Sequence, residues 1–126
     1  MTSVMNIALS GIRASTFRAQ NSANNISNAN SSSSLENGKV SNKVFLPKDI
    51  VQIADPNGGT FVKSRASDKQ PRITRDLTSG EELKVPDIDL NEELGKVQEA
   101  STEYAANLKV IQRQSEILGS LVNIFA

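Results

Sequence analysis

The chain has 126 residues, 14 basic and 14 acidic side chains, no histidine and no cysteine. The zero net charge argues against a general nucleic-acid binder and against a polybasic membrane-surface protein. The missing residue types exclude disulfides, thiol nucleophiles and the commonest metal ligands. No apolar run reaches the roughly 18 residues of a membrane helix. We therefore expect no enzymatic activity, no cofactor, no metal site and no membrane insertion.

An N-terminal stripe of mostly small side chains follows alternating steps of three and four residues. It comprises Met5, Ala8, Ile12, Ser15, Ala19, Ser22, Ile26 and Ala29. This spacing is typical of one face of a helix, which we expect from about residue 3 to about residue 28. Only Arg13 and Arg18 are charged before residue 36, so this helix is poorly suited to bulk water. We expect it to pack against protein on several sides.

The middle of the chain contains all four prolines and mixed charges. Residues 31–34 are a serine tract, which is typical of a flexible connector. Residues 43–46 and 49–53 are β-like runs. The turn sequence at 55–59, followed by residues 60–63, predicts a β-hairpin. Residues 64–87 hold two prolines and few apolar groups, and we expect an extended arm there.

The C-terminal segment carries the strongest pattern, an apolar repeat of 3.5 residues that is the period of a coiled-coil seam. Its members are Leu90, Leu94, Val97, Ser101, Tyr104, Leu108, Ile111, Ser115, Leu118, Val122 and Phe125. Asp89 is positioned as the N-cap, with Glu92 three residues later as in a capping box. We expect one helix of about 36 residues, on the order of 54 Å long.

The last ten residues, 117–126, carry no charged side chain. A second apolar stripe runs beside the seam, comprising Val110, Ile117, Leu121 and Ile124. A helix that is apolar over most of its circumference has to be buried, and one neighbouring helix cannot cover both stripes. These stripes favour an assembly subunit over a self-contained helical hairpin. We expect the assembly interface to contain Met5, Ala8, Ile12, Ala19, Ile26, Leu94, Val97, Tyr104, Leu108, Ile111, Ile117, Leu118, Leu121, Val122, Ile124 and Phe125.

These patterns together predict a mainly α fold. Long N- and C-terminal helices would pack in a coiled-coil-like tube, with a small β-hairpin and an extended segment between them. The predicted parts are an N-terminal helix of the helical core at 1–30, a linker, hairpin and arm at 31–87, and a C-terminal helix of the core at 88–126.

Three other features have simpler interpretations than a ligand site. The acidic cluster at 87–93 lacks the spacing and the glycine of a calcium-binding loop, and acidic residues at a helix N-terminus complement the helix dipole. The glycines at 58–59 lack the Lys-Ser/Thr pair of a phosphate-binding loop. Tyr104 has no adjacent base, so we interpret it as a packing residue of the seam.

Two motifs lie at opposite ends of the chain. The first is Ala8-Leu-Ser-Gly-Ile12 followed by Ser22-Ala-Asn-Asn-Ile-Ser-Asn-Ala-Asn30, and the second is Asp87-Ile-Asp89-Leu90 followed by Tyr104-Ala-Ala-Asn107. In this order and at these places they resemble the bacterial flagellar axial proteins, the family of rod and hook subunits. The likeness is strongest to the C-type proximal rod proteins. The positions that match the family motif are Ser10, Gly11, Asn25, Asn28, Asp89 and Asn107.

The resemblance implies a structural subunit of the flagellar basal-body rod, the drive shaft that crosses the periplasm. It implies export through the flagellar type III apparatus without a cleaved signal peptide. It also implies assembly with other copies and with other rod proteins into a tube that transmits torque. The residues alone leave an alternative, a soluble helical adaptor that presents its heptad seam to a partner helix.

Overall fold

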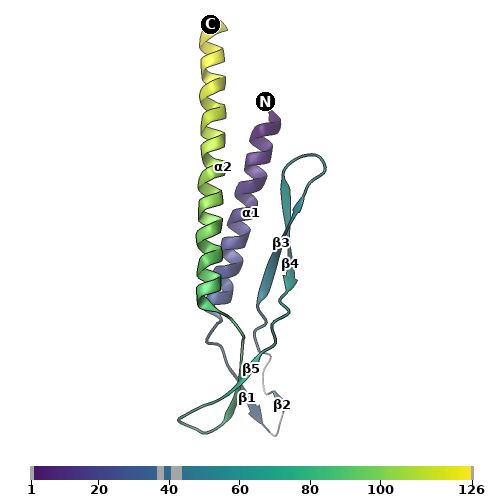
Figure 1. Ribbon diagram of the computed structural model, residues 1–126, viewed down its shortest axis with the longest axis vertical. Coiled ribbons are helices and arrows are strands. Elements are labelled where there is room, and N and C mark those ends of the chain that lie inside the picture. Colours follow the sequence, from purple (N-terminus) through teal and green to yellow (C-terminus); the bar gives the residue numbers. More distant parts are fainter. Residues whose placement is uncertain (1, 37–38, 41–43, 126) are drawn as a thin grey trace.

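The computed structural model describes residues 2–36, 39–40 and 44–125. Two antiparallel helices, α1 (Thr2–Ser27) and α2 (Leu90–Phe125), lie side by side, and the chain between them forms strands along α1 and beyond the end of the helices (Figure 1). The molecule exposes 8840 Å², whereas a compact monomer of this mass exposes about 6,600 Å². The protein is therefore elongated, with an unusually large surface for its length.

Two close contacts define the register of the helices. A Cβ built on Gly11 would meet the side chain of Asn107 at 2.6 Å, and Asn25 donates to Glu93 at 3.3 Å. The two residue numbers add to 118 in both pairs, so Thr2 lies level with Glu116. Because α2 continues to Phe125, its last two to three turns extend past the start of α1 (Figure 1).

The start of α2 has the cap expected from the sequence. The Asp89 carboxylate accepts hydrogen bonds from the backbone N–H groups of Asn91 at 2.9 Å and Glu92 at 3.2 Å, which confirms Asp89 as the N-cap. Glu92 does not complete a capping box, because its carboxylate pairs with Lys69 and Lys96.

The predicted hairpin is confirmed. Strands β3 (Lys48–Ala54) and β4 (Thr60–Ala66) pair antiparallel, with Ala54 opposite Thr60. Gly58 and Gly59 in the connecting turn both have φ of +96°, a conformation that glycine adopts without strain. We call β3 and β4 together the ribbon. It lies alongside α1 (Figure 1).

A second sheet occupies the end of the molecule where the helices meet the middle segment. Its order is β2 (Lys39–Val40), β1 (Ser33–Glu36), β6 (Glu82–Val85) and β5 (Arg72–Arg75), and every neighbouring pair is antiparallel. The serine tract therefore enters a strand, and residues 72–85 form two strands where an arm was expected. Of the β-like run at 43–46, residue 43 lies outside the described residues and residues 44–46 form no strand.

The prediction of a mainly α fold with helices packed in a coiled-coil-like tube is thus wrong. The middle of the chain forms two sheets, and the N-terminal helix is ten residues shorter than the C-terminal one. The second sheet left little sign in the sequence, and strand β5 shows why. All four residues of β5 are exposed, Ile73 to 62 %, so they show no alternation of buried and exposed positions.

Candidate assembly interface

The contact between α1 and α2 is built from small and polar residues. Ala8, Ser15 and Ser22 of α1 and Ala100 of α2 are each no more than 2 % exposed. Over the described residues, the buried hydrophobic side chains are three alanines and one isoleucine, Ile88. Small side chains let the helix backbones approach closely, and most of the larger apolar side chains of α2 remain exposed.

Asn25 joins three elements. Its amide Nδ2 donates to the Lys48 carbonyl at 2.9 Å, and its Oδ1 accepts from the Lys48 N–H at 3.2 Å. The same Nδ2 lies 3.3 Å from a carboxylate oxygen of Glu93. The Asn25 side chain is 1 % exposed, so these bonds satisfy an amide that water does not reach. Asn25 therefore holds α1, the start of the ribbon and the first turn of α2 together.

Other positions of the terminal motifs also make contacts within the chain. The Ser10 hydroxyl donates to the Ile7 carbonyl at 2.7 Å and accepts from the Thr60 N–H at 3.0 Å, which attaches the turn end of the ribbon to α1. Gly11 leaves the space that the Asn107 side chain occupies. Asn28 donates to the Asn24 carbonyl at 2.8 Å, where α1 ends. These positions thus serve packing, hydrogen bonding and capping.

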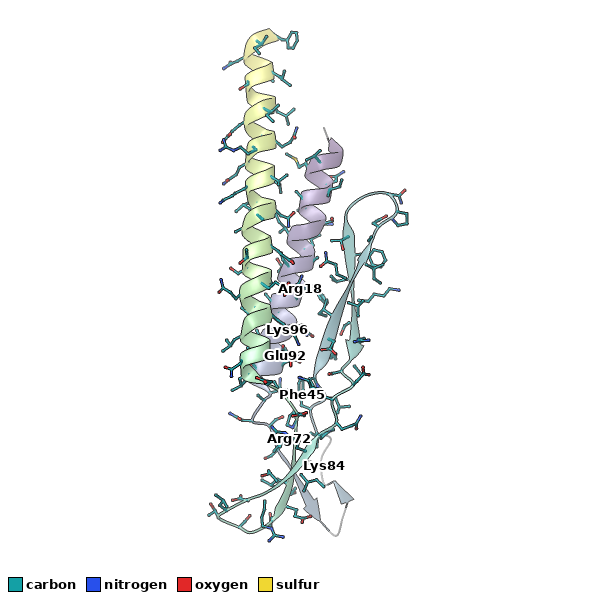
Figure 2. The ribbon with its side chains drawn as sticks, in the orientation of Figure 1. Arg18, Phe45, Arg72, Lys84, Glu92 and Lys96 are labelled. Atoms are coloured by element: carbon teal, nitrogen blue, oxygen red, sulfur yellow. The ribbon has the colours of Figure 1, made fainter. Side chains whose placement is uncertain are left out.

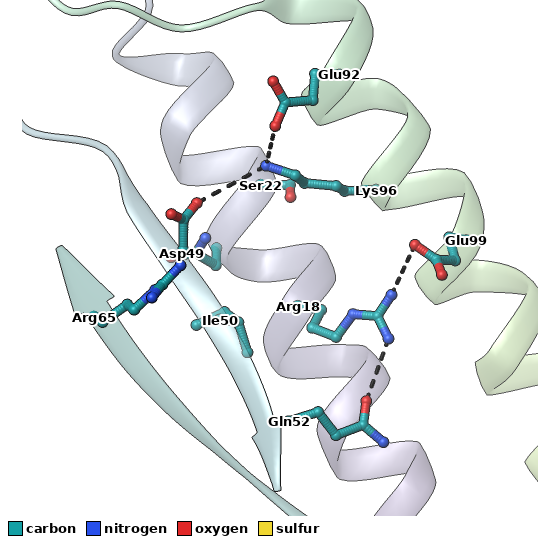
Figure 3. Close-up of a pocket in the computed structure, with 10 residues that line it drawn as sticks. Arg18, Ser22, Asp49, Ile50, Gln52, Arg65, Glu92, Lys96 and Glu99 are labelled. Atoms are coloured by element: carbon teal, nitrogen blue, oxygen red, sulfur yellow. Dashed lines mark hydrogen bonds and ion pairs between the residues drawn. The ribbon is translucent and has the colours of Figure 1, made fainter. Parts of the chain in front are cut away.

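The side of the helix pair that faces the ribbon is charged. A cleft of about 470 Å³ there is lined by side chains from α1, α2, β3 and β4 (Figure 3). Arg18 pairs with Glu103 at 2.7 Å and with Glu99 at 3.0 Å, so one arginine of α1 is fastened to two turns of α2. Figure 2 shows Arg18, Lys96 and Glu92 one above another along the helix pair. We call this the charged cleft.

A second ionic cluster is centred on Glu92 and Lys96, which also line this cleft. Lys96 pairs with Glu93 at 2.7 Å and with Glu92 at 2.9 Å, and Lys69 pairs with Glu92 at 2.6 Å. Hydrogen bonds from Lys69 and Lys96 lower the pKa of Glu92 to about 2. The hydrogen bond to Glu92 raises the pKa of Lys69. Partial burial opposes the charge on Lys96, but its hydrogen bonds to Glu93 and Glu92 outweigh that cost and raise its pKa. The cluster therefore joins the start of α2 to the segment that follows β4.

The opposite side of the helix pair is apolar. A groove of about 280 Å³ runs between the helices there, and no charged side chain of the described residues lines it. It is lined by Ser15, Thr16, Ala19 and Gln20 of α1 and by Val97, Ala100, Ser101 and Tyr104 of α2. We call it the open groove. At 100° per residue, Leu90, Leu94 and Leu108 fall on the same flank of α2, and they are 44 %, 56 % and 39 % exposed.

The structure divides the predicted interface residues into two groups. Covered or half-covered within the chain are Met5, Ala8, Ile12, Ala19, Ile26, Val97, Ile111, Leu118 and Leu121. Exposed are Leu94, Tyr104, Leu108, Ile117, Val122, Ile124 and Phe125. The N-terminal stripe thus meets α2 of its own chain, whereas much of the C-terminal seam faces outward.

The projecting end of α2 is the most exposed apolar part of that helix. Val122, Ile124 and Phe125 are 67 %, 74 % and 86 % exposed. We call residues 117–125 the tail; Ala126, also part of the uncharged run, lies outside the described residues. Neither the ribbon nor α1 extends alongside its end (Figure 1).

Sequence reasoning missed the charged cleft. A usable signal was present, because Glu92 and Lys96, and likewise Glu99 and Glu103, are four residues apart on one helix face. On α1, Arg18 supplies the cation that pairs with Glu99 and Glu103. The role of Asn25 had no such signal, since a buried asparagine and a solvated one look the same in a sequence.

Comparisons with known proteins leave the family open. Neither the comparison with protein-family models nor that with curated proteins found a match. Within the part of the chain that the structure describes, neither helix combines the length and the apolarity needed to cross a membrane. The resemblance of the terminal motifs to flagellar axial proteins stays a prediction.

Proposed function

We propose that this chain is a structural subunit of the bacterial flagellar basal-body rod. It is exported through the flagellar type III apparatus without a cleaved signal peptide. It assembles in the periplasm with further copies and with other rod proteins, through its terminal helices. It catalyses no reaction and acts by transmitting torque along the assembly.

The observation that carries the proposal is the outward-facing apolar surface of α2. Exposed large apolar residues recur from Leu90 and Leu94, through Tyr104 and Leu108, to the tail. Monomers rarely expose large contiguous apolar patches, and such patches mark sites of protein association. Further support comes from the terminal motifs, whose residues join the two ends of one chain into a single unit, as an axial subunit requires.

Gene deletion tests this function in the bacterium that encodes the chain. Cells without the gene should be non-motile, and electron micrographs should show basal bodies that lack a complete rod. A plasmid copy of the full chain should restore both. Deletion cells that swim and carry complete basal bodies would contradict the proposal.

One observation favours the alternative, a helical adaptor. The two helices already pair within the chain, so a monomer can present the open groove to one partner helix without assembling further. The two functions predict different oligomeric states in solution. A rod subunit should form oligomers whose size grows with concentration in analytical ultracentrifugation, whereas an adaptor should stay monomeric at every concentration.

A further inference from the structure

Two uncharged surfaces of this molecule have no partner within the described chain. The first is the open groove, floored by small side chains and bordered by Tyr104. The second is the tail, which has no charged residue over 117–125 and leaves Val122 and Phe125 mostly exposed. The groove has the volume of a few side chains, and the tail presents exposed apolar side chains on a helix.

The tail cannot occupy the groove of its own chain. Ser101 in the groove and Val122 in the tail belong to one continuous helix. At 1.5 Å per residue, the 21 steps between them correspond to about 32 Å. Any contact between these two surfaces must therefore join two molecules.

The distribution of charge makes the open groove a better docking site for the tail than the charged cleft. The charged cleft presents Arg18, Arg65 and Lys96 together with three carboxylates, and an apolar helix would desolvate them without offering polar partners. The open groove has no charged lining among the described residues, so an uncharged ridge enters it without that cost. On α2 the uncharged run at 117–125 is longer than any other uncharged stretch of the helix.

We propose that the tail of one copy docks in the open groove of a second copy. The contact is heterologous, because tail and groove are different surfaces, so each docked pair still has one free tail and one free groove. Successive copies then form an open chain with a defined direction. This inference rests on the proposed function, since it specifies how a subunit of an axial assembly recognises another copy of itself.

Disulfide cross-linking tests the contact, because the natural chain contains no cysteine. Full-length Ser101→Cys and Val122→Cys proteins are mixed and oxidised, and the products are separated without reductant. Both positions are exposed, so neither change disturbs the helix pair. The matched control is Thr102→Cys mixed with Val122→Cys, since Thr102 is the adjacent residue and lies outside the groove lining.

We expect a Ser101–Val122 heterodimer and little Thr102–Val122 product. The doubly substituted chain, Ser101→Cys with Val122→Cys, should give a ladder of linked oligomers. Two results would overturn the inference alone: dimers of Ser101→Cys with itself in place of the mixed product, or equal linking of Thr102 and Ser101, in protein that still self-associates by ultracentrifugation. Protein that stays monomeric at every concentration and forms none of these links would overturn the proposed function as well.

Discussion

The two sides of the helix pair use opposite kinds of residue. On the side that faces the ribbon, Arg18, Lys96 and their carboxylate partners connect α1, α2 and β3. On the other side the groove is uncharged and bordered by exposed apolar residues. Most soluble proteins place apolar groups inside and charges outside. Here polar and ionic contacts hold the single chain together, which leaves the apolar surface available for partners.

Placing a negative charge either at Ser101 or at the adjacent Thr102 gives the largest expected difference and tests whether the open groove binds a partner. Ser101→Glu puts a carboxylate in the open groove, where a docked partner would bury it at a cost of several kcal/mol. We expect assembly and motility to be lost while circular dichroism of the monomer is unchanged. Thr102→Glu adds the same charge one residue further along the helix, outside the groove lining. This control should assemble normally, and equal defects in both variants would contradict the assignment of the open groove as a docking surface.

Asn25→Leu tests how much the hydrogen bonds of Asn25 contribute to the stability of the folded chain. The change removes both hydrogen bonds between Asn25 and the Lys48 backbone; the Lys48 carbonyl still accepts from Asn21, whereas the Lys48 N–H loses the Asn25 oxygen, and we expect a loss of about 1–3 kcal/mol in the free energy of unfolding. Urea denaturation measures this loss. Asn6→Leu, at an exposed position of α1, should change stability by less than about 0.5 kcal/mol. A mild effect of Asn25→Leu would mean that α1 and the ribbon are held by other contacts.

Gly59→Ala tests how closely the ribbon lies against α1. Gly59 and Gly80 both have positive φ, so alanine at either position introduces backbone strain of about 1 kcal/mol. A Cβ at Gly59 would also collide with the Ser10 hydroxyl, whereas one at Gly80 would meet nothing within 4 Å. Gly59→Ala should therefore lower the thermal midpoint more than Gly80→Ala. Equal shifts would show that only the turn strain matters.

The smallest expected effect is the loss of stability at low pH that comes from Glu92 in the charged cleft. The pKa of Glu92 is lowered from 4.5 to about 2, so the group stabilises the folded state above pH 4.5 and loses this contribution as pH falls toward 2. Because Glu92 is 45 % exposed, the contribution at neutral pH is about 1 kcal/mol or less. Denaturation curves between pH 2 and pH 6 should show it, and Glu92→Gln should reduce the slope. An identical slope in the variant would assign the acid sensitivity to other carboxylates.

The sequence predicted those elements whose residues carry a local signal. The repeat from Leu90 onward, the Asp89 cap and the turn at Gly58 and Gly59 each predicted a feature of the structure. Part of the seam was predicted one residue out of position, although Val97, Ile111 and Leu118 are half-covered as expected. The chain turns Glu93, Ala100 and Asn107 toward α1 in place of Leu94, Ser101 and Leu108, because Asn25 and Gly11 set that register. Such contacts join distant parts of the chain and leave no periodic trace in the sequence.

The pairing of the two chain ends has a kinetic consequence. Arg18 and Glu103 are 85 residues apart, and Asn25 and Glu93 are 68 apart, so every contact that holds α1 to α2 closes a long loop. Contacts of high sequence separation form late, whereas the ribbon needs only neighbouring residues. Because synthesis begins at the N-terminus, α1 emerges without its partner until residues beyond 90 follow. The helix pair therefore stays open until nearly the whole chain has been synthesised.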